Sequence, residues 1–128
     1  MSQEETLCLC QSRKKYKECC LPFITGEGLP KTPEELMRSR YVAYNLGKFD
    51  FIKKTSYKEA LLLVNANPEQ HKLDGVRLDI ITASEECETG HVEFKAYYQK
   101  EGRISYIHEK SEFEKVKGTW LYVKGTLL

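Results

Sequence analysis

The chain has 128 residues, of which 41% are hydrophobic and 30% are charged, as in an ordinary globular protein of one domain with a small appendage. Its net charge of +1 gives no overall attraction to nucleic acid or to a membrane surface. No apolar run approaches the ~20 residues of a membrane-spanning helix, and residues 1–7 are polar and acidic, unlike a signal peptide. We therefore expect a cytoplasmic protein with no membrane contact.

Four of the five cysteines fall within thirteen positions near the start of the chain: Cys8, Cys10, Cys19 and Cys20. The segment between them is polar and basic, so burial alone does not hold it in place. One Zn²⁺ ion bound by four thiolates is the simplest arrangement that fits. An ion with four protein ligands has no open coordination position, which predicts a structural role and not a catalytic one.

The spacing of the cysteines leaves two alternatives to zinc open. Two disulfides are disfavoured because the expected compartment is reducing. Four unligated thiols are disfavoured because a segment as charged as residues 11–18 resists burial. The order C-x-C…C-C also differs from the two-knuckle zinc pattern C-x-x-C…C-x-x-C. Four loop cations are placed to offset the charge of a zinc–thiolate centre: Arg13, Lys14, Lys15 and Lys17.

Residues 26–30 contain two glycines and a proline, which predict a turn-rich connector. The first long helix then begins at Thr32, the expected N-cap, and Glu35 completes a capping box. Gly47 is a natural residue to end it. The apolar face of this helix also carries Arg40, either as a cation that reaches solvent at the edge or as a buried cation aimed at a cavity or at the cysteines.

A short second helix is predicted from Phe49 onward. Helical spacing continues over residues 57–64, although the run 61–64 also fits a buried strand. Residues 65–70 are predicted to be a loop.

Four strands follow, over residues 76–83, 92–99, 104–113 and 120–124. Their turns are predicted at Thr89-Gly90, Glu101-Gly102 and Lys117-Gly118. Short turns make neighbouring strands antiparallel, and helices followed by such a meander give an α+β fold with the helices on one face of the sheet.

The spacing of the four cysteines, with Ser12, Lys14, Lys15 and Tyr16 between them, resembles the SEC-C motif, named after the C-terminus of the secretion ATPase SecA. In that family the cysteines at these four places bind zinc, which implies the same role for Cys8, Cys10, Cys19 and Cys20. The usual Gly-Ser-Gly after the second cysteine appears here as Gln11-Ser12-Arg13.

The rest of the chain resembles the YchJ-like family of bacterial proteins, which joins such a motif to a cone-shaped α+β domain of the nuclear transport factor 2-like (cystatin-like) type. Four segments carry the resemblance: residues 36–44, 92–94, 108–113 and 118–125. It implies a zinc-binding motif and connector over residues 1–31 and a cone over residues 32–128. It also implies a sheet that curls around the first helix and leaves a pocket.

That fold hosts enzymes, carriers and interaction domains, so it implies no single activity. No phosphate loop, nucleophile elbow or catalytic metal spacing is present in the sequence. His108 and Glu109 are adjacent in a predicted strand, where neighbours point to opposite faces, so they cannot act together. His108 by itself is more often a core histidine than a catalytic group.

We therefore expect a non-enzymatic protein with a structural zinc ion, whose zinc motif contacts a protein partner, as the resemblance to the SecA tail suggests. The alternative is an enzyme or a small-molecule carrier that uses the pocket of the cone. Nucleic-acid binding by the basic loop is the weakest of these hypotheses because the net charge is close to zero. Five residues are predicted to line the pocket: Arg40, Tyr44, Tyr98, His108 and Trp120.

Overall fold

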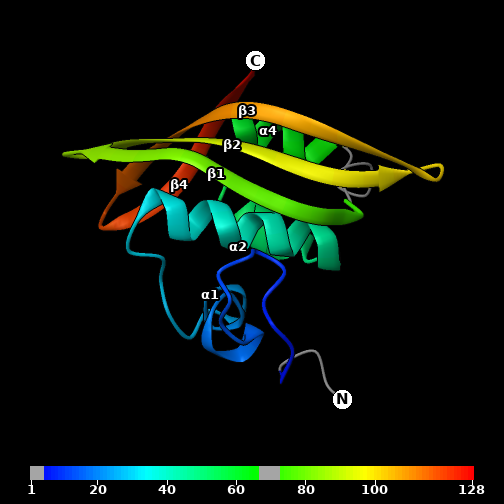
Figure 1. The fold of residues 1–128 in the computed structure, drawn as a ribbon. Coiled ribbons are helices and arrows are strands. Elements are labelled where there is room, and N and C mark those ends of the chain that lie inside the picture. Colours follow the sequence, from blue (N-terminus) through cyan, green and yellow to red (C-terminus); the bar gives the residue numbers. More distant parts are fainter. Residues whose placement is uncertain (1–4, 67–72) are drawn as a thin grey trace.

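The computed structural model describes residues 5–66 and 73–128, which form helices packed on one face of an antiparallel sheet (Figure 1). The helical elements are the 3-10 turn η2 (Tyr16–Glu18) and the helices α1 (Leu21–Thr25), α2 (Pro33–Leu46), α3 (Phe49–Lys54) and α4 (Glu59–Ala66). The strands are β1 (Gly75–Glu86), β2 (Thr89–Lys100), β3 (Arg103–Val116) and β4 (Thr119–Leu127). Within the described ranges, no helix has the length and apolarity needed to cross a membrane. The predicted α+β fold is confirmed.

Helix α2 runs through the middle of the molecule, with the sheet on one side and residues 6–25, here called the cysteine motif, on the other (Figure 1). Its start is as predicted, because the Oγ1 atom of Thr32 accepts a hydrogen bond from the backbone N–H of Glu35 at 3.1 Å. The Glu35 carboxylate accepts from the backbone N–H of Lys31 at 2.7 Å, one residue before the usual partner in a capping box. Gly47, with φ 72°, ends the helix.

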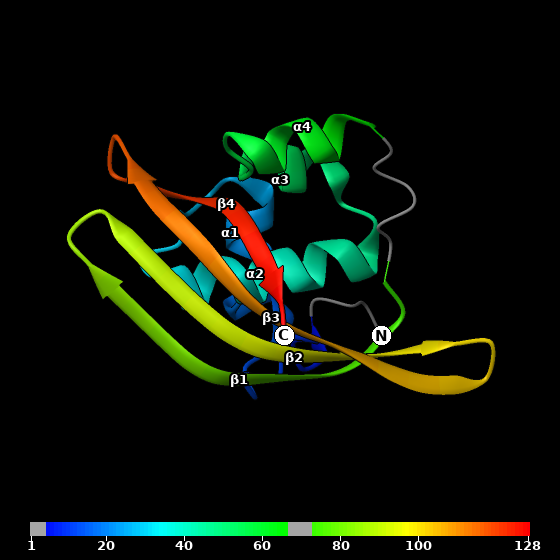
Figure 2. The same ribbon diagram turned by 90° about the horizontal axis from the view of Figure 1, so that it is seen from above.

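The four strands form a meander in the order β1-β2-β3-β4, and each neighbouring pair is antiparallel. Figure 2 shows the sheet curving around α2, with α3 and α4 on the side of β4. The inner face of the sheet is apolar because buried and half-buried residues alternate along β2. Side chains from α2, α3 and the sheet fill the core between them: Leu36, Ile52, Val92, Phe113 and Trp120.

The first hairpin turn differs from the prediction. The chain reverses at residues 87–88, where Cys87 has φ 54°, and Thr89-Gly90 already belongs to β2. Gly90 is buried there, and a Cβ atom at this position would collide with the ring of Pro33 at the start of α2. The glycine is therefore explained by the close approach of α2 to β2 and not by a turn.

Other local predictions are confirmed. The turns at Glu101-Gly102 and Lys117-Gly118 are present, and both glycines have a positive φ. Residues 59–66 form α4, so the helical interpretation was correct and the alternative strand was not. The helix includes residues 65 and 66, which were predicted as loop, and the remainder of that predicted loop, residues 67–70, lies outside the described residues.

Candidate functional site

A closed loop over residues 6–16 carries the first two cysteines of the motif. The backbone N–H of Cys8 donates to the carbonyl of Lys14 at 2.7 Å, which joins the two arms of the loop. At the tip, Gln11 and Arg13 have φ values of 70° and 71°, in the left-handed region that glycine favours. The loop thus has a backbone suited to Gly-Ser-Gly without the glycines, at a cost of about 1–2 kcal/mol for each residue.

The second pair of cysteines lies where η2 meets α1. Cys20 is the N-cap of α1, and its carbonyl accepts a hydrogen bond from the backbone N–H of Ile24 at 3.0 Å. Gly26, with φ 89°, ends this short helix. Tyr16 is only 6% exposed, so the segment between the cysteine pairs is less solvated than its polar sequence suggests.

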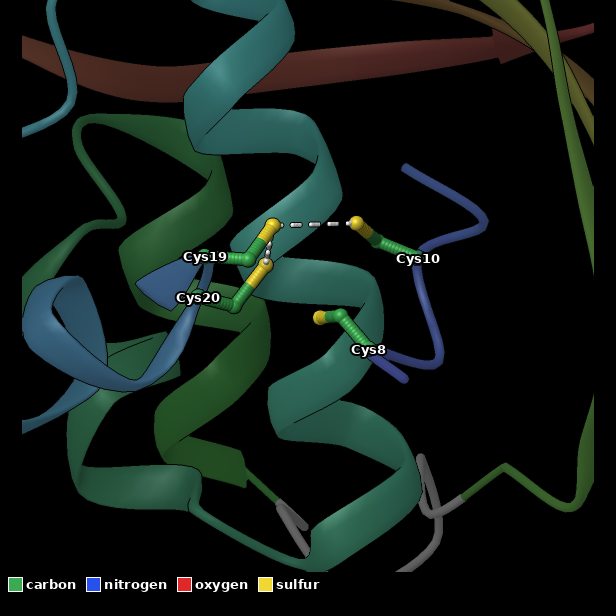
Figure 3. Close-up of side chains that lie close together, drawn as sticks. All are labelled: Cys8, Cys10, Cys19 and Cys20. Carbon is green, nitrogen blue, oxygen red and sulfur yellow. Dashed lines mark hydrogen bonds between the residues drawn. The ribbon is translucent and has the colours of Figure 1, made fainter. Parts of the chain in front are cut away.

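The four sulfur atoms face one another across the gap between these two segments (Figure 3). All four lie within 4.8 Å of one another, with the Sγ of Cys19 3.5 Å from that of Cys10 and 3.8 Å from that of Cys20. All five cysteines are free. Tetrahedral Zn²⁺, with Zn–S bonds of about 2.3 Å, holds its sulfur ligands about 3.8 Å apart. The donor set and its spacing therefore fit a four-thiolate metal site.

The electrostatics of the cluster also favour a cation. Cys8, Cys10 and Cys20 are 4%, 0% and 1% exposed. Hydrogen bonds from Cys20 and Cys8 lower the pKa of Cys10. The contact with Cys10 in turn raises the pKa of Cys8 to about 12 and also raises the pKa of Cys20. One thiolate is stabilised while its neighbours retain their protons, because like charges this close repel, and a divalent cation removes that conflict.

Arg38, on α2, links the cysteine motif to the cone. Its Nη1 donates a hydrogen bond to the carbonyl of Cys10, and its Nε pairs with Glu34 at 3.0 Å. Residues two apart in a helix point about 200° apart, so Arg38 faces the cysteines while Arg40 faces the sheet. The sequence alone leaves open which arginine faces which side. Helical periodicity, together with the position of the cysteine motif on α2, assigns Arg38 to the cysteine side and Arg40 to the sheet side.

Two of the four loop cations that were expected to offset the thiolates pair with a carboxylate instead. Lys15 and Lys17 pair with Glu5 at 3.3 and 2.6 Å. Arg13 and Lys14 are exposed. Within residues 5–66 and 73–128, one arginine or lysine side chain donates a hydrogen bond to the backbone of a cysteine. It is Arg38 of α2, which is distant in sequence from the cysteines.

The chain matches two family profiles. The SEC-C motif matches residues 6–22, and the YchJ middle NTF2-like domain matches residues 32–125. The chain belongs to the YchJ-like UPF0225 family. A UPF0225 protein of Shewanella sp. (strain MR-4) is 38% identical over 130 residues, which cover 92% of this chain and 79% of that protein. A UPF0225 protein of Deinococcus radiodurans is 34% identical, over 91% of this chain and 85% of the relative.

Two solved structures share the whole fold of this family member. The solution structure of a SEC-C motif containing protein from Rhodopseudomonas palustris has a TM-score of 0.87 at 33% identity and covers 96% of this chain and 99% of that one. The crystal structure of a SEC-C motif containing protein from Psychrobacter arcticus has a TM-score of 0.84 at 27% identity, over 100% and 86% of the two chains. The resemblance inferred from the sequence is confirmed.

A second candidate site is a cavity of about 310 Å³ between α2 and the inner face of the sheet. Arg40 and Tyr44, two of the five predicted pocket residues, line it. The guanidinium of Arg40 is buried, which decides between its two predicted positions in favour of the cavity. Further lining residues come from α2 and three strands: Met37, Phe94, Ile107, Glu109, Ser111 and Tyr122.

The other three predicted pocket residues are not among the lining residues. His108 lies on the outer face of β3, where its Nε2 is 2.8 Å from the carboxylate of Glu93. Tyr98 lies toward the end of β2 that pairs with the start of β3. Trp120 lies beside the connector, and its indole N–H donates to the carbonyl of Lys31 at 3.2 Å. His108 was assigned to the inner face of β3, whereas the structure places it on the outer face. For Tyr98 and Trp120, facing and polarity in the sequence did not show how far along the sheet each residue lies.

Glu109, Ser111 and Tyr122 are cavity residues that were not predicted from the sequence. A signal for the first two existed in strand alternation, since Phe113 is a core residue and residues at even spacing from it share its face. The same rule places His108 on the opposite face. Tyr122 comes from β4, where it pairs with Phe113 and lies two residues after the core residue Trp120, so the same alternation places it on the inner face.

Proposed function

We propose that the four cysteines hold one structural Zn²⁺ ion and that the chain is a non-enzymatic binding protein whose cysteine motif contacts a protein partner. The cluster of four sulfurs within 4.8 Å is the observation that carries this proposal. Four protein ligands leave no coordination position for a substrate. The cysteine motif is too small to fold on buried area alone, so metal binding supplies much of its folding free energy.

The surface of the cysteine motif supports a protein partner. Leu7 and Leu9 alternate with Cys8, so that the thiol is buried while the two leucines are 65% and 40% exposed. Apolar side chains displayed on a metal-braced loop need little further ordering on binding, which favours association. The nearby apolar surface and the absence of an open metal position together favour a contact surface over a catalytic one.

The test uses the full chain, with elemental analysis and affinity capture from a lysate followed by a binding measurement on the purified candidate. The parent is expected to hold one equivalent of zinc, and Cys19→Ser/Cys20→Ser is expected to hold none. Leu7→Glu/Leu9→Glu is expected to retain zinc and to weaken partner binding at least tenfold, equal to about 1.4 kcal/mol. Leu29→Glu, which alters a 56% exposed leucine of the connector, is the matched control and should change neither.

The zinc site and the partner surface can each be disproved separately. A parent chain without zinc would show that the cluster is not a metal site. Equal partner binding by the parent and the Leu7→Glu/Leu9→Glu variant would show that this surface is not the contact.

The second candidate function is binding of a small molecule in the cone. It is supported by the cavity, whose volume of about 310 Å³ falls at the lower end of known ligand sites. A buried arginine on its wall gives it a charged group that could fix the orientation of a ligand. Titration of the zinc-loaded chain with small charged and neutral probes tests this function.

A further inference from the structure

Arg40 is a buried cation whose direct hydrogen-bond partners are all neutral. Its Nη1 donates to the carbonyl of Ile52 at 3.1 Å and to the hydroxyls of Thr55 and Ser56 at 2.7 and 3.1 Å. The ring of Tyr122 lies 4.4 Å from its Cζ, a cation–π contact. Among the residues that the structure describes, no carboxylate lies at ion-pair distance from it. Glu109, in the same cavity, acts on Arg40 electrostatically from beyond ion-pair distance. A bound anion in direct contact with the guanidinium would offset more of the cost of burying its charge.

The contacts of Arg40 leave one edge of the guanidinium for a ligand. Nη1 is anchored by three hydrogen bonds, whereas Nη2 has one long contact, 3.5 Å from the hydroxyl of Tyr44. In the described part of the chain no acceptor is found for Nε. The adjacent N–H groups on Nε and Nη2 form the fork that binds a carboxylate with two parallel hydrogen bonds.

Glu109 places a fixed acceptor in the same cavity. Its Oε2 accepts hydrogen bonds from the hydroxyls of Ser111 and Tyr122 at 2.8 and 3.2 Å. A Cβ atom on Gly125 would collide with this carboxylate, so the glycine makes room for it. Burial raises the pKa of Tyr122, which keeps its hydroxyl protonated as a donor to Glu109. The second oxygen, Oε1, has no hydrogen-bond donor among the described residues.

The remaining wall of the cavity is largely apolar and includes Met37, Phe94 and Ile107. A ligand that fits this wall needs an apolar body between two polar ends. One end must be anionic to match Arg40, and the other must carry a hydrogen-bond donor to match Glu109. The volume restricts this ligand to a small molecule.

We propose that the cavity binds a small monocarboxylate with an apolar body and a hydroxyl or ammonium group at its far end. The carboxylate pairs with the Nε and Nη2 atoms of Arg40, and the far donor meets Glu109. This inference rests on the second candidate function and deepens it. It is independent of the zinc proposal, because none of these residues belongs to the cysteine motif.

The test is an NMR titration of the zinc-loaded full chain with probes that share one body: 4-hydroxyphenylacetate, 4-(aminomethyl)phenylacetate, phenylacetate and 4-hydroxyphenylacetamide. We expect the two donor-bearing carboxylates to shift the signals of Arg40 Nε–H and of the Ala96 and Ser111 amides. The neutral amide is expected to bind at least tenfold more weakly than 4-hydroxyphenylacetate, because it lacks the charge that pairs with Arg40. Phenylacetate, which lacks the far donor, is expected to lie between them.

Variants separate the two ends of the ligand. Glu109→Gln is expected to weaken the ammonium probe about tenfold and the hydroxyl probe less than threefold, because a neutral amide still accepts a hydrogen bond. Glu112→Gln on the same strand is the matched control, since Glu112 pairs with Lys124 at 3.6 Å and does not line the cavity. It should leave both affinities unchanged.

Arg40→Met should abolish the preference for carboxylate over amide, and if this variant does not fold, the comparison of probes on the parent chain still decides. The inference is wrong if the amide binds as tightly as the carboxylate, or if neither donor-bearing carboxylate shifts cavity signals at about 10 mM, the limit of weak specific binding. Zinc content is measured on the same samples. A failed titration on a chain with one zinc equivalent overturns only the ligand, whereas a zinc-free chain overturns only the metal site.

Discussion

The cysteine motif and the cone are stabilised by different means, although they share helix α2. In the cone, large apolar side chains such as Phe113 and Trp120 are 1% exposed and pack between the helices and the sheet. In the cysteine motif, the most deeply buried side chains are thiols, and Tyr16 is the one buried aromatic residue among residues 6–25. The hydrophobic effect can therefore fold the cone, whereas the motif, under the function proposed above, depends on a metal ion bound by its sulfurs.

Helix α2 also separates the two sites chemically. Arg38 reaches the backbone of Cys10 on one side, and Arg40 lies at the cavity on the other. One helix thus gives a cation to each site because two residues along a helix turn the side chain to the opposite face.

The largest effect is expected from removing the proposed zinc ion. A strong chelator, or Cys10→Ser, should unfold the cysteine motif, because thiolate–zinc binding contributes on the order of 10 kcal/mol in small zinc modules. Hydrogen exchange should show loss of protection at the amides of Cys8 and Tyr16, while the amides of β2 remain protected. Simultaneous loss in both regions would show instead that the motif and the cone unfold as one unit.

The next largest effect is expected in the cone. Trp120→Ala should lower the free energy of unfolding by about 3–5 kcal/mol, because it leaves a cavity at a fully buried position. Urea denaturation measures this change. Zinc content should stay at one equivalent under native conditions, and its loss would contradict the separation of the two regions. Trp120→Phe, which keeps most of the ring volume, is the milder control.

A smaller effect is expected at the junction. Arg38→Ala should lower the free energy of unfolding by about 1–2 kcal/mol, because the carbonyl of Cys10 loses a charged donor. It should also speed the release of zinc to a chelator. Glu34→Gln removes only the ion pair to Arg38 and should cost less than about 0.5 kcal/mol. Equal zinc release by the parent and Arg38→Ala would show that the contact does not brace the motif.

The smallest effect is a gain in stability. Gln11→Gly and Arg13→Gly should each stabilise the zinc-bound loop by about 0.5–1 kcal/mol, because glycine adopts a positive φ without strain but loses more entropy on folding. The measurement is a slower transfer of zinc to a chelator. Lys14→Gly, in the same loop but without a positive φ, is the matched control and should speed transfer. The urea midpoint of the cone should not change.

Predictions from the sequence succeeded where short-range chemistry decides the outcome. The N-cap at Thr32 and the helix end at Gly47 depend on hydrogen bonds and φ values within a few residues. The hairpin turns at 101–102 and 117–118 are local for the same reason. The turn assigned to Thr89-Gly90 was wrong because Gly90 is required by the close approach of Pro33, a residue far away in the sequence.

The four-cysteine set, the family and the order of helices and strands all follow from the amino-acid sequence. The spacing of cysteines, the capping of helices and the alternation along strands each depend only on residues close together in the chain. The folded chain was needed to show that Arg38 faces the cysteines and Arg40 the cavity, and that Glu109 lies inside while His108 lies outside. A strand or a helix defines its faces locally, but what covers each face depends on register, curvature and packing between distant segments.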